Sequence, residues 1–365
     1  MVDTLKALLL LCGAYLDARP FVAAEKLGLP PELLWKNDSK TAQQLQLRET
    51  ALERIRALEA KNWAEREYEA CMEKDVKLIF YGCDDYPQAL YDLPQPPSVL
   101  YWQGCGKPLS ARTVGVVGTR RSSSYGLRTA ETIGVECSRR HTSVISGGAL
   151  GIDGASHSGA CMANGSTFAV LGTGIDVVFP MENARLFEDI KRHGALISEF
   201  PLGERGEAWH FPRRNRIVAA LSQKLVVVEA PLKSGAMITA RLALDLGREV
   251  WAVPGRICDR VSEGTNRLIF DGAYPFIGME TFFGSQPEQG NLFADGVRPV
   301  AQKEEDFPPD EAAVMSSLWN SGGKTVDNIA LEVKMSAADV LKIIAVLSAK
   351  GAVYSSGPGR YSAKV

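Results

Sequence analysis

The sequence of 365 residues has few of the residue types that build metal or covalent catalytic centres. It contains 4 histidines and 7 cysteines, and no two cysteines have the C-x-x-C spacing. A histidine pair with metal-ligand spacing and a nucleophile elbow are also missing. We therefore expect no metal, no cofactor and no catalytic residue. An odd, dispersed set of cysteines is typical of reduced thiols and predicts a cytoplasmic protein.

Two nucleotide-binding fingerprints are missing as well. The first predicted strand of the central region ends in Gly118-Thr119-Arg120, which does not match G-x-G-x-x-G, and no G-x-x-x-x-G-K-[ST] loop occurs. Gly172-Thr173-Gly174 is a lone G-x-G, which is a weak signal. These absences argue against a redox dinucleotide enzyme.

The sequence also lacks long hydrophobic runs and a strong net charge. The apolar run from Leu8 to Leu11 is too short to span a bilayer and has no basic flank of the signal-peptide kind, so we expect no membrane partner. A formal net charge of −2 argues against a histone-like partner, although a local basic cleft would not show in this total. With 45% hydrophobic residues, a chain of this length is expected to form two or three globular domains.

The most informative stretch runs from Thr113 to Ala160. Two short β-rich runs, Thr113 to Val117 and Ser143 to Ser146, each lead into a glycine-rich loop and then a helical pattern. Successive units of this kind place their loops at the carboxyl edge of one parallel sheet, where ligands bind. Free backbone N–H groups and helix N-termini at that edge attract phosphate. The alternative is that the glycines only make tight turns.

Further strands alternate with helices up to about Phe283, which predicts a doubly wound parallel sheet. The segments Val76 to Phe80 and Ser98 to Trp102 are predicted strands that extend this sheet. Residues 1–70 are predicted to be helical, with one long amphipathic run from Thr41 to Met72. We predict a fold of the α/β class with four parts: a helical module (1–72), a parallel-sheet core (73–283), a linker (284–309) and a C-terminal module (310–365).

The C-terminal module is predicted to be a winged helix, because three helices precede a hairpin. Thr325 and Ser336 are expected to cap the second and third helices. From Asp306 to Val365 the sequence has six acidic and six basic residues, so its charge cancels. Strong binding of duplex DNA is therefore not expected, and a protein contact or weak nucleic-acid binding is favoured. For the helical module, packing is favoured over binding of DNA.

Basic residues gather at the positions that follow the predicted strands. They are expected to face one rim of the sheet, where several phosphates spaced along a single strand would bind. Rings at Trp209, His210 and Phe211 are available to stack an unpaired base. We expect a turn from His210 to Arg216, followed by a short helix from Ile217. The basic residues are Arg120, Arg121, Arg213, Arg214, Arg216 and Lys233.

Structural roles are the alternatives for these residues. Arg214 and Arg216 could pair with Glu199 or Glu229, and Phe211 could be a core residue. His157 and His210 are lone histidines and are predicted to lie on the surface.

Seven phrases of the sequence resemble, in order, those of the DprA/Smf family of DNA-processing proteins, over residues 77–280. They are VGTRRSSSYG, SGGALGIDGASH, TFAVLGTGIDVVFP, LISEFP, FPRRNRIVAALS, VVVEAPLKSGAMITARLALDLGREVWAVPG and EGTNRLIFDGA.

The resemblance implies an extended Rossmann-like core, flanked by a SAM-like helical module and a winged helix. It implies a protein without catalytic activity that binds single-stranded DNA, protects incoming strands and loads the RecA recombinase onto them during natural transformation. A homodimer through the core is also implied. The predicted phosphate-binding residues are Gly118, Thr119, Arg120, Ser146, Gly147, Gly148, Arg213, Arg214, Asn215 and Lys233, and Phe211 is the predicted base-stacking residue.

One enzymatic alternative shares this layout. The core is similar to that of nucleotide phosphoribohydrolases, which carry P-G-G-x-G-T-x-x-E with a catalytic glutamate. This sequence has Ser146-Gly147-Gly148 followed by Asp153 instead. Asp153 is the candidate general base of a nucleotide N-glycosidase, and helix capping is its favoured structural role.

Overall fold

The computed structural model describes residues 3–36, 39–106, 112–284, 308–318, 324–350, 352–357 and 360–363. Their contacts divide the chain into two compact units, Met1–Gln286 and Pro287–Val365. Each unit is described by itself.

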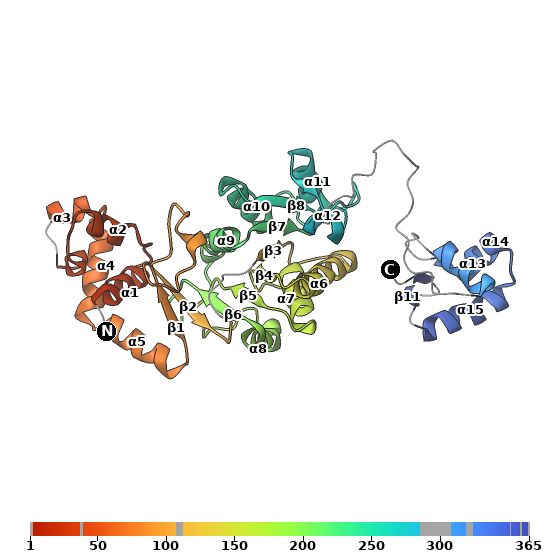
Figure 1. Ribbon diagram of the computed structural model, residues 1–365, viewed down its shortest axis with the longest axis horizontal. Coiled ribbons are helices and arrows are strands. Elements are labelled where there is room, and N and C mark those ends of the chain that lie inside the picture. The colour runs from red at the N-terminus through yellow and green to blue at the C-terminus, as the bar shows by residue number, and fades with distance from the viewer. Residues whose placement is uncertain are drawn as a thin grey trace. The chain divides into compact units, whose positions relative to one another are not determined.

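Within the described residues, the larger unit has a nine-stranded sheet in the order β1-β2-β6-β5-β4-β3-β7-β8-β9 (Figure 1). The strands from β6 to β9 in this order are parallel, whereas β1 and β2 are antiparallel and extend the sheet beyond β6. The strands are β1 (Lys77–Phe80), β2 (Val99–Gln103), β3 (Thr113–Val117), β4 (Ser143–Ser146), β5 (Thr167–Val170), β6 (Ala195–Ser198), β7 (Lys224–Val227), β8 (Glu249–Ala252) and β9 (Tyr274–Pro275).

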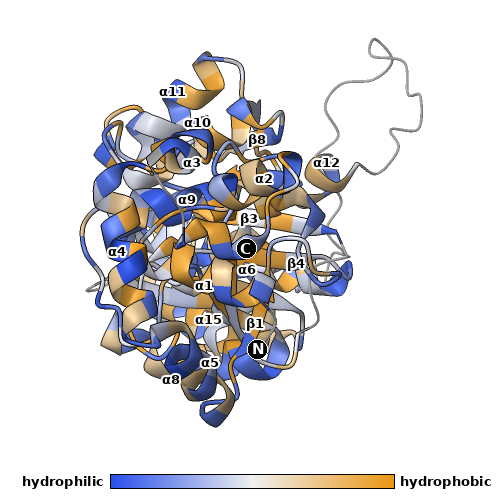
Figure 2. Ribbon diagram, turned by 90° about the vertical axis from the view of Figure 1, so that its left-hand side faces the viewer, coloured by the Kyte–Doolittle hydropathy of each residue, from blue (hydrophilic) through white to orange (hydrophobic). Residues whose placement is uncertain are grey.

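Helices cover both faces of this sheet. Helices α9 and α10 pack on one face, and α6 and α7 pack on the other (Figure 1). Central strands are apolar on both sides because both faces are covered, and Figure 2 shows them largely in orange. The helices are α6 (Ser124–Arg139), α7 (Ile152–Met162), α8 (Ala184–His193), α9 (His210–Leu221), α10 (Gly235–Asp245), α11 (Glu263–Phe270) and α12 (Met279–Phe283), with the 3₁₀ turns η2 (Gln88–Leu90), η3 (Met181–Asn183) and η4 (Arg260–Ser262).

This architecture confirms the predicted α/β class with a large, mostly parallel sheet. The predicted turn from His210 to Arg216 is wrong, because α9 already begins at His210. Pro212 misled the interpretation: a proline is compatible with the first turn of a helix, where its missing N–H is not needed.

The N-terminal helices are α1 (Asp3–Gly13), α2 (Arg19–Lys26), the 3₁₀ turn η1 (Pro31–Leu34), α3 (Ser39–Gln44), α4 (Glu49–Ala60) and α5 (Trp63–Glu73). The single long helix predicted from Thr41 to Met72 is wrong. It is interrupted at Gln46 and Asn62, whose φ angles of 57° and 50° are left-handed. The break at Gln46 buries both of its neighbours, Leu45 and Leu47, so tertiary packing overrides the helical pattern.

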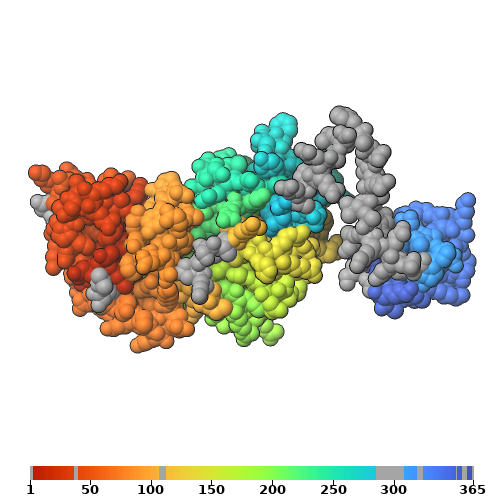
Figure 3. Space-filling model, viewed as in Figure 1, coloured from red at the N-terminus to blue at the C-terminus, as the bar shows by residue number. Residues whose placement is uncertain are grey.

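These helices share a hydrophobic core with the sheet, through β2 residues such as Tyr101 and α8 residues such as Phe187. Figure 3 shows the N-terminal residues (red to orange) directly against the rest of the larger unit. The SAM-like assignment and the boundary at residue 72 stay predictions.

The smaller unit contains α13 (Pro309–Leu318), β10 (Lys324–Thr325), α14 (Val326–Val333), α15 (Ala337–Ala349), β11 (Val353–Gly357) and β12 (Arg360–Ala363). Its sheet has the order β10-β12-β11. The expected caps are present, because the hydroxyl groups of Thr325 and Ser336 accept hydrogen bonds from the amides of Asn328 and Asp339. The winged-helix assignment stays a prediction, and the predicted linker lies almost wholly outside the described residues.

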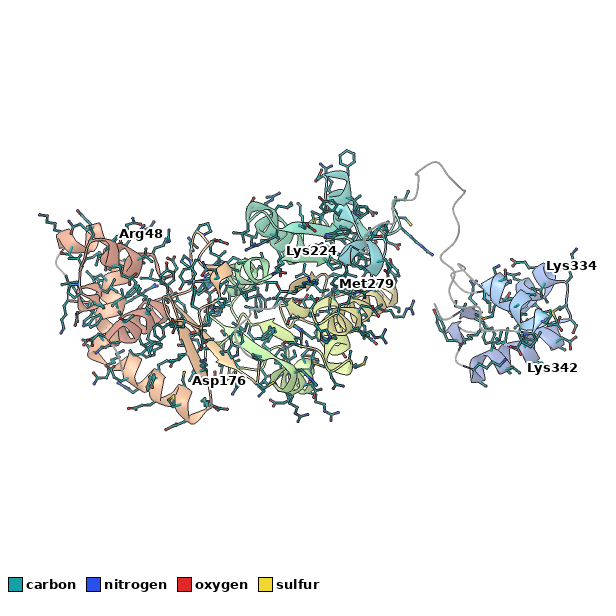
Figure 4. The ribbon with its side chains drawn as sticks, viewed as in Figure 1. Arg48, Asp176, Lys224, Met279, Lys334 and Lys342 are labelled. Carbon is teal, nitrogen blue, oxygen red and sulfur yellow. The ribbon has the colours of Figure 1, made fainter. Side chains whose placement is uncertain are left out.

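Lys342, a basic residue of α15, has an acidic partner on the same helix. Figure 4 labels Lys334, which follows α14, and Lys342, which lies on α15. Lys342 pairs with Asp339 at 3.1 Å, one turn away on the same helix.

In the described part of the chain, no helix is long and apolar enough to cross a membrane.

Helices α6 and α7 approach each other at glycine positions. A Cβ atom at Gly134 of α6 would lie 2.2 Å from the carbonyl oxygen of Ser156, and one at Gly159 of α7 would lie 2.1 Å from that of Glu131. Only glycine permits this approach. The contact fixes the relative position of the two loops that precede these helices.

The two histidines that were predicted to lie on the surface are both fully buried, so this prediction is wrong. His157 lies on α7, and its Nδ1 is 2.7 Å from the hydroxyl oxygen of Thr167. Its Nε2 has no hydrogen-bond partner among the described residues. Burial, with a smaller contribution from the charge of Arg214, lowers the pKa of His157 from 6.5 to about 3.

We predict that His157 makes the protein less stable in acid. Between the two pKa values the unfolded chain binds a proton that the folded chain does not, so stability is full above about pH 6.5 and falls below it by about 1.4 kcal/mol per pH unit. Between pH 7 and pH 5, the free energy of unfolding should decrease by about 2 kcal/mol more in the wild type than in His157→Leu, measured by urea denaturation. Equal decreases in the two proteins would contradict this assignment.

Candidate functional site

A cleft of about 360 Å³ opens at the carboxyl edge of the sheet. Four segments form it: the loop after β3, the loop after β4, the first two turns of α9 and the start of α10. Its lining residues are Val117, Gly118, Thr119, Arg120, Arg121, Gly147, Ala149, Asp153, Phe211, Arg214, Asn215, Val218, Pro231, Lys233, Ser234, Gly235, Ala236 and Thr239.

Most of the predicted site residues line this cleft together. The structure brings Gly118, Thr119, Arg120, Gly147, Phe211, Arg214, Asn215 and Lys233 into it. Arg120 and Arg214, which come from different loops, face the same space. Lys233 and Arg121 add two exposed cations at its rim.

Three predicted residues do not line the cleft. The hydroxyl of Ser146 is buried and donates to the carbonyl oxygen of Val116, inside the sheet. Gly148 faces the ring of Phe187 on α8. Arg213 donates through Nη1 to the carbonyl oxygen of Tyr15 at 2.8 Å, away from the cleft. Arg213 and Arg214 are consecutive residues of a helix, so their side chains leave α9 in different directions, and the prediction that both face the rim is wrong for Arg213.

Arg214 is buried and is held by backbone carbonyl groups. Its Nη1 donates to the carbonyl oxygen of Gly147 at 2.6 Å and also to that of Val170. Its Nε donates to the side-chain oxygen of Asn215 at 3.2 Å. The guanidinium thus joins α9 to the ends of β4 and β5. Arg214 therefore does not form the ion pair with Glu199 or Glu229 that was the structural alternative. Arg216 does form such a pair, because its Nη2 lies 2.5 Å from Glu199.

Asp153 supplies a negative charge beneath the cleft. Its carboxylate accepts a hydrogen bond from the amide of Gly147 at 3.2 Å, while the N-cap of α7 is Gly151. Asp153 therefore holds the loop after β4, and the predicted capping role is wrong. Burial raises the pKa of Asp153, whereas Arg214 and the amides of Ala149, Gly147 and Gly118 act in the opposite direction.

Burial also affects Arg214, whose pKa is lowered to about 10. Asp153 opposes this shift and the charge of Arg120 adds to it. Arg214 stays protonated at neutral pH. Because Arg120 and Arg214 repel each other across the cleft, an anion that enters between them would be stabilised by both.

Arg120 covers one side of the predicted base-stacking residue. Its guanidinium lies 5.1 Å from the centre of the Phe211 ring. A Cβ atom at Gly172 would come within 2.9 Å of that ring, and Phe179 lies at a centroid distance of 5.8 Å. Phe211 is half-buried, so it is neither a core residue nor a free platform.

The sequence interpretation missed two parts of the site. A smaller cavity of about 100 Å³ adjoins the cleft and is bordered by Leu150, Phe179 and Pro180 in addition to Arg120, Arg214 and Phe211. The start of α10 also contributes Ser234, whose hydroxyl accepts from the amide of Met237. The phrase Lys233-Ser234-Gly235 was a usable signal, because a serine cap marks a helix N-terminus, where backbone amides lack partners within the helix.

Arginines and a lysine therefore line a cleft beside the N-terminus of α10, at the carboxyl edge of a Rossmann-like sheet. Residues 77–285 match the family described as DNA recombination-mediator protein A. The chain belongs to this family of DNA-processing proteins.

Similar proteins support this assignment. DNA processing protein DprA of Bacillus subtilis (strain 168) is 36% identical over 279 residues, which are 73% of this chain and 94% of that protein. Protein Smf of Escherichia coli (strain K12) is 42% identical over 197 residues, which are 54% of this chain and 53% of that protein.

Two solved structures are also similar. The X-ray structure of DprA from Streptococcus pneumoniae has a TM-score of 0.64 and 31% identity, and the match covers 75% of this chain and 94% of that one. The structure of DprA from Helicobacter pylori, described for its mode of binding single-stranded DNA, has a TM-score of 0.52 and 30% identity, with 56% of this chain and 94% of that one covered.

We predict that Gly147→Ala disrupts the cleft. Its Cβ atom would lie 2.6 Å from both Nη2 of Arg214 and Oδ2 of Asp153, two buried groups. Overpacking of this kind typically costs about 1–3 kcal/mol, and urea denaturation should show that loss. Gly235→Ala is the matched control, because the nearest atom to its Cβ is 3.8 Å away. Equal stability of the two variants would contradict the prediction.

Proposed function

We propose that this protein binds single-stranded DNA without sequence preference and without catalysing a reaction, through phosphates held in the cleft. Arg120, Arg214 and Lys233 would contact phosphates, and Gly118, Thr119 and Gly147 would shape the wall of the site. The amides of these three residues already donate to Asp153 or to the carbonyl oxygen of Glu229. The observation that carries the proposal is that Arg120 and Arg214 line one cleft. The binding of single-stranded DNA described for the H. pylori relative supports the same conclusion.

The cellular role that we propose follows from the family. The protein would protect incoming single strands in the cytoplasm and load the RecA recombinase onto them during natural transformation. Phosphate contacts carry no sequence information, which suits a protein that must accept any incoming strand. The base-stacking role of Phe211 remains part of this proposal. A base on the covered side of the ring would have to displace the Arg120 guanidinium.

A homodimer through the core is also part of the proposal. The strand β9 forms one edge of the sheet, and exposed apolar side chains occur on the segments between β8 and α12, which include β9. Ile257, Phe270 and Ile277 are 94%, 80% and 70% exposed. Exposed apolar side chains beside an open sheet edge are typical of a protein interface.

Hydrolysis of a nucleotide N-glycosidic bond is the second candidate function. Asp153 is its only candidate base in the part of the cleft that the structure describes, and this carboxylate is buried and bonded to the Gly147 amide. A base must reach the substrate, so this geometry favours a structural role. Incubation with AMP and analogues discriminates the two functions, because released base would support the enzyme.

We predict that Arg120→Ala weakens binding equally on all single-stranded sequences. The loss of one phosphate contact should reduce the slope of log affinity against log salt by about 0.7. Fluorescence anisotropy of labelled oligo-dT and of a mixed sequence, titrated at several salt concentrations, measures both quantities. Arg192→Ala is the control, because Arg192 lies on α8 and pairs with Asp189 at 3.3 Å. An unchanged affinity and slope for Arg120→Ala would remove this residue from the site.

We predict that Phe270→Asp converts the dimer to a monomer, because a carboxylate would have to be desolvated in the interface. Sedimentation velocity of the full chain measures the change. Leu27→Asp, an exposed apolar position on the N-terminal helices, is the control and should remain dimeric. A dimer that withstands Phe270→Asp would place the interface elsewhere.

A further inference from the structure

The segment from Glu199 to Trp209 links β6 to α9, and the N-terminal helices hold it at three points. The thiol of Cys12 lies 3.4 Å from the carbonyl oxygen of Glu199. The hydroxyl of Tyr15 donates to Glu204 at 2.7 Å. Cys12 lies on α1 and Tyr15 lies just after that helix. A third contact comes from α5, and all three join residues that are far apart in sequence.

That third contact uses a buried carboxylate. Oε1 of Glu67 accepts from the amide of Leu202 at 2.7 Å and from the hydroxyl of Tyr101 at 2.9 Å. Glu67 is 8% exposed. A buried carboxylate with two donors holds the segment more firmly than a surface contact would, because breaking either bond leaves a polar group without a partner.

The first turn of α9 is attached to the same helices through Arg213. Nη1 of Arg213 donates to the carbonyl oxygen of Tyr15 at 2.8 Å, and Nε donates to Oε2 of Glu199 at 3.3 Å. The Tyr15 ring contacts the Trp209 ring edge-on, with centroids 5.5 Å apart. One residue, Tyr15, therefore contacts both the linking segment and the start of α9.

The next residue of α9 is Arg214, which reaches the cleft from the other side of the helix. Its guanidinium meets two backbone carbonyl groups and the side chain of Asn215. A side chain that is already held in place loses little conformational entropy when a phosphate binds. An arginine that is displaced from this position would bind phosphate less tightly. The position of Arg214 depends on where α9 begins.

We propose that Tyr15 and Arg213 are positioning residues, which hold the start of α9 against the N-terminal helices and so place Arg214 in the cleft. The inference rests on the proposed binding of single-stranded DNA and assigns the N-terminal module a role in it. Arg213 acts without touching the DNA. Glu199 remains paired with Arg216 when Arg213 is changed, so the substitution does not leave an isolated buried charge.

The test compares Arg213→Gln and Tyr15→Phe with the wild type in the full-length protein. We expect Arg213→Gln to weaken binding of labelled oligo-dT by about tenfold and Tyr15→Phe by about threefold, since each loses hydrogen bonds that involve a charged group. The salt slope should stay at the wild-type value in both variants, because no phosphate contact is lost. Arg213→Lys keeps the charge and should restore part of the affinity.

Hydrogen exchange gives a readout that needs no DNA. Amides from Glu199 to Arg214 should exchange faster in Arg213→Gln, while those of β3 and β4 should not change. Glu59→Gln is the matched control. It alters an ion pair of the N-terminal helices, with Lys6 at 3.4 Å, and does not contact the linking segment. Its affinity, slope and exchange should match the wild type.

Several outcomes would overturn the inference. A salt slope reduced by about 0.7 in Arg213→Gln would make Arg213 a direct phosphate ligand. Unchanged affinity and exchange in both variants would show that the contacts do not position α9. These outcomes differ from failure of the proposed function, in which the wild type itself does not bind oligo-dT. In that case, exchange alone still decides whether Tyr15 and Arg213 hold α9.

Discussion

The buried guanidinium of Arg214 is the interaction on which the cleft depends. It joins α9 to the carbonyl groups of Gly147 and Val170, at the ends of two adjacent strands. Asp153 compensates the charge from below and binds the amide of the same Gly147. A buried cation with carbonyl and carboxylate neighbours is tolerated because its Nε and both N–H groups of its Nη1 donate to oxygen atoms.

Much of the central fold could be predicted from the sequence, because the strands are short β-rich runs, and glycine follows β3, β4 and β5 at once or after one residue. Arg120, Arg214 and Lys233 could be assigned to one rim because they follow strands of one sheet. The direction of a side chain on a helix could not be predicted while residues 210–216 were interpreted as a turn. This explains why Arg213 was assigned to the cleft and the contact with Tyr15 was not foreseen.

Other features depend on contacts between distant parts of the chain, which a local pattern does not contain. His157 and His210 are polar residues with no sequence signal of burial, and both lie under neighbouring elements. The break at Gln46 follows from the packing of Leu45 and Leu47 rather than from helix propensity. Local signals were sufficient where the structure is local, as for the caps at Thr325 and Ser336.

The glycine contact between α6 and α7 has a consequence for how the cleft can move. Because the backbones of these helices meet at Gly134 and Gly159, the loops after β3 and β4 are held in one position relative to each other. A change in the width of the cleft would therefore come from the opposite wall, which α9 and α10 provide. That wall includes the start of α9, which contacts the N-terminal segment through the hydrogen bond from Arg213 to Tyr15.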